Sequence, residues 1–179
     1  MLLRALIICL FASQLLMPQG LQRRTYTIKG RTIAYDMIAF RPPVQITPDN
    51  GALNQDTAIN CVRLFWSRLS KLDIEGASQL YIDPQRELDA RTKYRQRVGE
   101  ETFREMHSKI FGSTRFTHEL VIGAQHGLVS DNKLGTLLLF RVRGGIFFLE
   151  SPELGKLSQD ATDLIALVNA FGDGKLKFD

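Results

Sequence analysis

The chain has 179 residues, of which 44% are hydrophobic and 23% are charged. This composition is typical of a globular domain and argues against a disordered chain or a polytopic membrane protein. Two cysteines are too few for a disulfide scaffold, and no Cys and His residues have metal-ligand spacing, so we expect neither a metal nor a cofactor. The formal net charge of +4 is small and dispersed, which argues against a nucleic-acid partner because such binding needs a concentrated basic face.

Residues 1–20 have the pattern of an export signal. Arg4 precedes an apolar run that reaches Met17. The run is shorter than the roughly 20 residues of a membrane-spanning helix and suits the core of a signal peptide. We therefore expect an exported protein, periplasmic or extracellular. Because no clear Ala-x-Ala cleavage site follows, the alternative of an uncleaved anchor at residues 1–17, which would hold the protein at the membrane, stays open.

Residues 21–55 are predicted to form a β-hairpin and a linker. Two β-rich runs within residues 25–40 surround a three-residue loop with Gly30 at its centre. We expect the tandem prolines 42 and 43 to end the hairpin, since proline cannot continue a hydrogen-bonded ladder. Residues 56–179 then form an α+β domain.

Three helical segments follow the linker. Asp56 is a suitable N-cap for the first, in which apolar residues recur with the spacing i, i+4, i+7, i+8 and i+11. Asp73 is expected to cap a second, short helix at residues 74–81. The third segment, residues 85–111, breaks at Gly99.

Cys61 falls next to the apolar stripe of the first helix. If residues 1–20 are removed, the sequence keeps this one cysteine. A lone thiol in an oxidising compartment is either buried or part of an intermolecular disulfide. The helical spacing favours a buried, unreactive thiol.

From Ser113 onward the apolar pattern has a period of two, which is typical of β-strands. Glu119 is predicted to face the opposite side of its strand from His118. His126, beside Gly127, is predicted to lie in a turn. The residues expected on the face of His118 are Phe116, Leu120 and Ile122.

The sequence Gly144-Gly145 predicts a two-residue hairpin turn between strands at 134–143 and 146–150. The register of this turn places Arg141 diagonally opposite Glu150. The residues that it pairs directly are Val142 with Phe147, and Phe140 with Leu149.

A final helix is predicted from Ser158 to Phe171, so that strands and helices segregate along the chain. This order predicts an α+β fold in which an antiparallel sheet packs against helices, with an N-terminal hairpin and a C-terminal helix.

Residues 56–151 resemble the nuclear-transport-factor-like superfamily, which includes SnoaL-like and ketosteroid-isomerase-like domains. The segments that carry the resemblance are Phe65–Leu69, Lys71–Ala77 and Leu80–Pro84. The resemblance implies a cone-like arrangement with a cavity between the helices and a curved sheet, used in that superfamily for small apolar ligands and sometimes for catalysis. The N-terminal hairpin and the C-terminal helix depart from its minimal plan, and the helix is placed to plug or cover the cavity.

Four residues are candidates for a site in such a cavity. A neutral His118 would serve as a general acid/base, with Asp83 or Glu150 as its carboxylate partner. The sequence favours the other interpretation, a structural histidine that is hydrogen-bonded to the backbone. The candidates for lining the cavity are Trp66, Tyr81, His118 and Phe140, although core packing is the favoured role for the aromatic residues.

Three hypotheses on function follow from the sequence. The first is an exported, non-catalytic module that binds a partner protein or a small apolar ligand. The second is a small lyase or isomerase that uses His118 for general acid/base chemistry. The third is a component of a cell-envelope assembly that residues 1–17 anchor to the membrane. A homodimer formed through the sheet is a further arrangement that the predicted strands allow.

Overall fold

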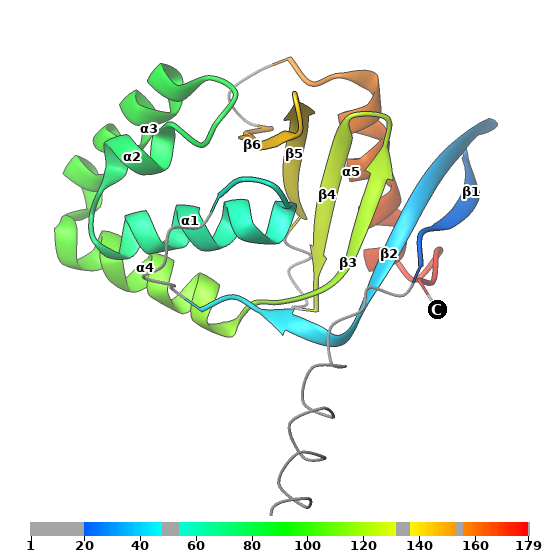
Figure 1. Ribbon diagram of the computed structural model, residues 1–179, viewed down its shortest axis with the longest axis horizontal. Helices are drawn as coiled ribbons and strands as arrows, with labels where there is room; N and C mark the ends of the chain where they lie inside the picture. The colour runs from blue at the N-terminus through cyan, green and yellow to red at the C-terminus, as the bar shows by residue number, and fades with distance from the viewer. Residues whose placement is uncertain (1–19, 48–53, 132–136, 153–155, 179) are drawn as a thin grey trace, which may run out of the picture.

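The computed structural model describes residues 20–47, 54–131, 137–152 and 156–178. Within these ranges the chain forms one six-stranded antiparallel sheet and five helices (Figure 1), which is the predicted α+β class with a C-terminal helix. The predicted export signal lies outside the described residues except for Gly20. The strands are β1 (Gln22–Ile28), β2 (Arg31–Gln45), β3 (Arg115–Ile122), β4 (Gln125–Ser130), β5 (Leu137–Arg143) and β6 (Ile146–Glu150). The helices are α1 (Ala58–Ser70), α2 (Ile74–Ser78), α3 (Pro84–Val98), α4 (Glu100–Ser113) and α5 (Gln159–Gly172).

Helices pack on both faces of the sheet, whose strands lie in chain order from β1 to β6. Adjacent residues of a strand point to opposite faces, so each central strand contributes to two hydrophobic clusters. In β4, Leu128 packs in the cluster under α1, whereas Val129 packs in the cluster under α5. The C-terminal helix therefore covers the face opposite to α1 and does not plug the space between α1 and the sheet.

The N-terminal hairpin belongs to this sheet because β2 pairs with β3. The prediction that Pro42 and Pro43 end the strand is wrong, since β2 continues to Gln45. The pairing shifts in register between Ala39 and Val44, so the prolines lie where the ladder is interrupted and no proline N–H is required.

A β-bulge in β3 corrects a second prediction. Phe116 pairs with Ser130 and His118 pairs with Val129, which leaves Thr117 as an extra residue in β3. This extra residue puts Phe116 and His118 on opposite faces, whereas strict alternation predicts a shared face. Phe116 consequently packs in the cluster under α1, together with Leu128.

The helix starts follow local capping chemistry. The predicted cap Asp56 is one residue early, since Thr57 is the N-cap of α1 and accepts a hydrogen bond from the backbone N–H of Asn60. Asp73 caps α2 as predicted. Asp83 caps α3, where Pro84 occupies a first-turn position that needs no N–H donor. Gly99 separates α3 from α4 with a φ of 85°.

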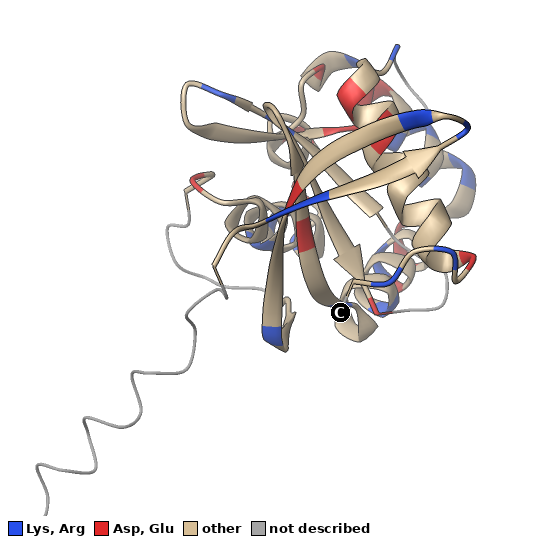
Figure 2. Cartoon of the chain, turned by 90° about the vertical axis from the view of Figure 1, so that its right-hand side faces the viewer, with Lys and Arg blue, Asp and Glu red and all other residues tan. Residues whose placement is uncertain are grey.

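The Gly144-Gly145 hairpin has the predicted register, with Val142 opposite Phe147. Arg141 donates to Glu150 at 2.6 Å across this hairpin, as the diagonal placement predicts. Basic and acidic positions are spread over strands and helices alike (Figure 2). In the part of the chain that the structure describes, every helix falls short of the length and hydropathy that a membrane crossing requires.

Candidate functional site

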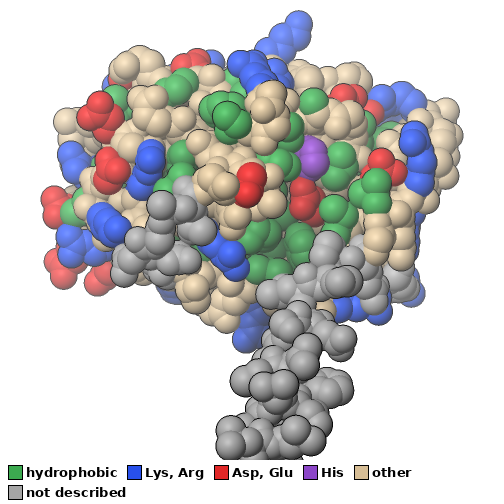
Figure 3. Space-filling model, in the orientation of Figure 1, with side chains coloured by type: hydrophobic (Ala, Val, Ile, Leu, Met, Phe, Trp, Pro, Cys, Tyr) green, Lys and Arg blue, Asp and Glu red, His purple; other side chains and the backbone are tan. Residues whose placement is uncertain are grey.

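A groove of about 460 Å³ lies between β2 and the first half of α1, and we call it the β2–α1 groove. Its volume falls within the roughly 300–1,000 Å³ that is typical of small-molecule sites. Figure 3 shows hydrophobic side chains gathered at the centre of this face, with a histidine and an acidic side chain beside them. The groove is lined by Ile38, Phe40, Arg41, Pro42, Val44, Thr57, Ile59, Asn60, Arg63 and Glu119.

The floor of the groove follows from the alternation along β2. Ile38 and Phe40 point toward α1, whereas Met37 and Ala39 are buried on the other face. The β2–β3 ladder is interrupted beyond Ala39 and resumes where Val44 pairs with Phe116. Phe40, Val44 and Ile59 are partly buried and pack against the cluster under α1, so the floor is continuous with the core.

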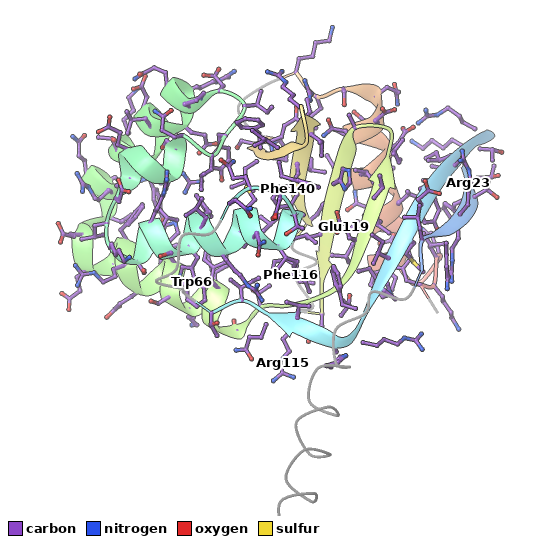
Figure 4. All side chains as sticks on the ribbon, viewed as in Figure 1. Arg23, Trp66, Arg115, Phe116, Glu119 and Phe140 are labelled. Atoms are coloured by element: carbon purple, nitrogen blue, oxygen red, sulfur yellow. The ribbon has the colours of Figure 1, made fainter. Side chains whose placement is uncertain are left out.

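Glu119 lines the groove, and it is hydrogen-bonded to His126 on the neighbouring strand β4. Nδ1 of His126 lies 2.7 Å from Oε1 of Glu119, with 17% and 11% of the two side chains exposed. The His126 ring also packs edge-on against Phe147, with 4.8 Å between ring centroids. In Figure 4, Glu119 lies on the sheet near the end of α1. Since a carboxylate accepts hydrogen bonds, Nδ1 of His126 donates to Glu119.

Arg41 and Arg63 supply positive charge to the groove. Nη1 of Arg63 donates to the amide oxygen of Asn60 at 3.4 Å, one turn earlier on α1. Among the described residues, neither arginine forms an ion pair with an acidic side chain. The groove therefore combines an apolar floor, a hydrogen-bonded carboxylate and two arginines that have no acidic partner among the described residues.

His118 lies on the α5 side of the sheet, away from this groove. Its Nε2 is 3.0 Å from the carbonyl oxygen of Phe178, and its Nδ1 is 2.9 Å from the hydroxyl of Thr117. Burial lowers the pKa of His118, and nearby Arg24 and Arg41 lower it further. Since a carbonyl only accepts, Nε2 donates, and the ring is a neutral link between β3 and the C-terminal residues. The structure brings neither Asp83 nor Glu150 to it: Asp83 caps α3, and Glu150 pairs with Arg141.

The predicted lining residues Trp66, Tyr81 and Phe140 lie in the packed core under α1. Trp66 stacks on Phe111 with 5.6 Å between ring centroids, and Phe140 is fully buried. Figure 4 labels Trp66 on α1 and Phe140 on β5. The space in which the resemblance implies a cavity therefore holds tightly packed aromatic side chains.

Tyr81 borders a smaller hollow of about 180 Å³ whose charged side chains include the Arg141–Glu150 pair. The Tyr81 hydroxyl accepts a hydrogen bond from Nη2 of Arg91 at 2.7 Å. Burial raises the pKa of Tyr81 far above its usual value, so the phenol stays protonated. The hydroxyl is one acceptor for the partly buried guanidinium of Arg91, which also pairs with Glu87.

The described residues form neither a reactive cysteine nor a metal site. Cys61 is fully buried, as its helical position predicts, and burial raises the pKa of its thiol to about 12. Within the described ranges, no three His, Cys, Asp or Glu side chains are close enough together to hold a metal ion.

The sequence predictions missed the residues that line the groove. His126 lies in β4 and not in a turn, because the turn between β3 and β4 is formed by Gly123 and Ala124. Recognising this two-residue turn would have placed Glu119 and His126 diagonally across one face. The contribution of Arg63 depends on the packing of α1 beside β2, for which the sequence carries no local signal.

Searches of family models, curated proteins and solved structures found no match to this chain. The resemblance to the nuclear-transport-factor-like superfamily therefore stays a prediction.

Proposed function

We propose that this protein is an exported, non-catalytic module that binds a small, largely apolar ligand in the β2–α1 groove. The observation that carries the proposal is the groove itself, about 460 Å³ in volume and with an apolar floor. A few polar groups at the edge of an apolar hollow are typical of small-molecule sites. The apolar residues are Ile38, Phe40, Pro42, Val44 and Ile59.

The affinity of such a groove comes from apolar surface removed from water. Each buried methylene group contributes about 0.8 kcal/mol. A chain of about ten methylene groups gains roughly 8 kcal/mol, before the loss of translational and rotational freedom is subtracted. A ligand of this size therefore binds weakly to moderately, and blocking the floor should abolish most of the affinity.

The proposal is tested by titrating the protein with an apolar fluorescent probe, 1-N-phenylnaphthylamine. We expect saturable binding that Ile59→Trp weakens by at least about tenfold, because the indole fills the groove. The matched control is Ile146→Trp, since Ile146 is 46% exposed on β6 and lies outside the groove lining. Absence of saturable binding, or equal affinities for wild type and Ile59→Trp, would contradict the proposal.

Export is supported by the sequence of residues 1–20. Amino-terminal sequencing of protein recovered from the exported fraction tests it. A new amino terminus close to residue 20 is the expected result. An intact Met1 in a membrane fraction would favour the anchored alternative, and protein confined to the cytoplasm would contradict both.

The contact of His126 with the lining residue Glu119 supports a second proposal, general acid/base chemistry by His126 on a ligand in the same groove. The 2.7 Å contact holds the imidazole in one tautomer, as catalytic histidines require. A bound ligand with an acidic C–H bond would then exchange hydrogen with solvent, and incubation in D₂O followed by mass spectrometry would detect the exchange. This candidate requires deuterium incorporation by wild type that His126→Asn abolishes; a ligand recovered without deuterium rules it out.

A further inference from the structure

We infer that the ligand of the β2–α1 groove is a single-chain amphiphile with one carboxylate, whose hydrocarbon chain lies on the apolar floor and whose carboxylate pairs with Arg63. The inference rests on the proposed function, since it names the class of ligand for the same groove.

The charges around the groove favour an anion. One acidic residue, Glu119, lines it, and its carboxylate already accepts a hydrogen bond from His126 at 2.7 Å. Arg41 and Arg63 line it as well. In the described part of the chain neither guanidinium lies within ion-pair distance of an Asp or Glu, and Arg63 contacts only the neutral amide of Asn60. Among the described residues that line the groove, the charge left without a counterion is therefore positive.

The positions on α1 bring an apolar and a cationic group to one edge. Ile59 and Arg63 are four residues apart, so they lie on the same helix face one turn from each other. The aliphatic stem of an arginine covers apolar surface while its guanidinium stays near water. The polar end of a ligand whose chain lies on the groove floor therefore meets the guanidinium of Arg63. A planar guanidinium binds a carboxylate through two parallel hydrogen bonds, which a neutral alcohol cannot reproduce.

The size of the groove selects a single chain. Its volume of about 460 Å³ lies in the lower part of the roughly 300–1,000 Å³ range of small-molecule sites. This volume favours one hydrocarbon chain over a two-chain lipid.

Isothermal titration calorimetry of the full chain with decanoate and with decanol, each below the concentration at which it self-associates, tests the inference. We expect wild type to bind decanoate about tenfold more tightly than decanol, the effect of one charge-assisted contact. Arg63→Gln should remove this preference and keep the affinity for decanol. The matched control is Arg143→Gln, which removes the same charge from an exposed position outside the groove lining and should keep the preference.

The outcomes separate this inference from the proposed function. Equal binding of decanoate and decanol by wild type, with both weakened by Ile59→Trp, overturns the carboxylate inference and leaves the groove as the binding site. A preference for decanoate that survives in Arg63→Gln also overturns it. Binding to vesicles of anionic lipid without binding of monomeric decanoate overturns it in favour of a membrane surface. If neither compound binds and phenylnaphthylamine does not bind either, the proposed function fails together with the inference.

Discussion

Nδ1 of His126 lies 2.7 Å from Oε1 of Glu119, across the neighbouring strands β4 and β3. The two residues meet because the Gly123-Ala124 turn pairs Val121 with His126, which puts Glu119 diagonally opposite His126 on the same face. Both side chains are mostly buried, so each needs the other as a hydrogen-bond partner. The pair fixes the polar edge of the β2–α1 groove.

Replacing Glu119 by alanine should lower the free energy of unfolding by about 1–3 kcal/mol, because the substitution leaves a mostly buried imidazole N–H without its acceptor. Urea denaturation followed by circular dichroism measures the change. Glu105→Ala on the exposed side of α4 is the control, with an expected effect within about 0.5 kcal/mol. Equal effects of the two substitutions would show that the pair contributes nothing to stability.

The stability of the fold should fall as the pH is lowered below about 6.5, the ordinary pKa of histidine. Burial lowers the pKa values of His118 and His107 in the folded state, so the unfolded chain takes up protons first. The contribution of the two histidines to the free energy of unfolding is therefore fully present above pH 6.5. It is lost as the pH falls through their lowered pKa values in the folded state.

Urea denaturation of wild type and His118→Asn at pH 7.5 and pH 5 measures this dependence. The variant should lose less stability between the two pH values than wild type, with His107 accounting for part of the remaining slope. An unchanged slope in the variant would show that His118 does not titrate as its burial requires.

The thiol of Cys61 should be unreactive in the folded protein. The side chain is fully buried, and burial raises its pKa to about 12, so almost no thiolate forms at neutral pH. In a Cys9→Ser variant, Ellman's reagent should modify Cys61 only after guanidinium is added. Rapid modification of the native variant would contradict the packing of α1 against the sheet.

Thr57→Ala should lower the free energy of unfolding by about 1 kcal/mol, since the hydroxyl of Thr57 caps α1. Asp56→Ala should have a smaller effect, because Asp56 accepts a hydrogen bond from the side-chain amide of Asn60, whereas Thr57 holds the cap position. Thermal or urea denaturation of both variants decides between the two caps. A larger effect at Asp56 would restore the cap that the sequence pattern predicts.

The parts of the fold that the sequence predicts well are those that local chemistry determines. Gly144 and Gly145 both adopt positive φ, so the turn sets the pairing of the strands that flank it. Asp73 and Ser158 cap the helices that they precede in the sequence. Each of these features depends on residues within a few positions of one another.

The candidate site depends on contacts between distant residues. Ile38 and Glu119 lie opposite each other in the β2–β3 ladder, although 81 positions separate them in the sequence. Whether Phe116 faces α1 is decided by the bulge at Thr117, which alternation alone does not reveal. His118 is a candidate in the sequence because it interrupts an apolar alternation, and this signal marks a structural histidine as readily as a functional one.

Amide chemical-shift mapping during a titration with phenylnaphthylamine decides whether the β2–α1 groove is a ligand site. The largest shifts are expected at residues 38–44 of β2 and 57–63 at the start of α1, with saturation at one probe per chain. Shifts confined to other elements, or no saturable shifts at all, would contradict it.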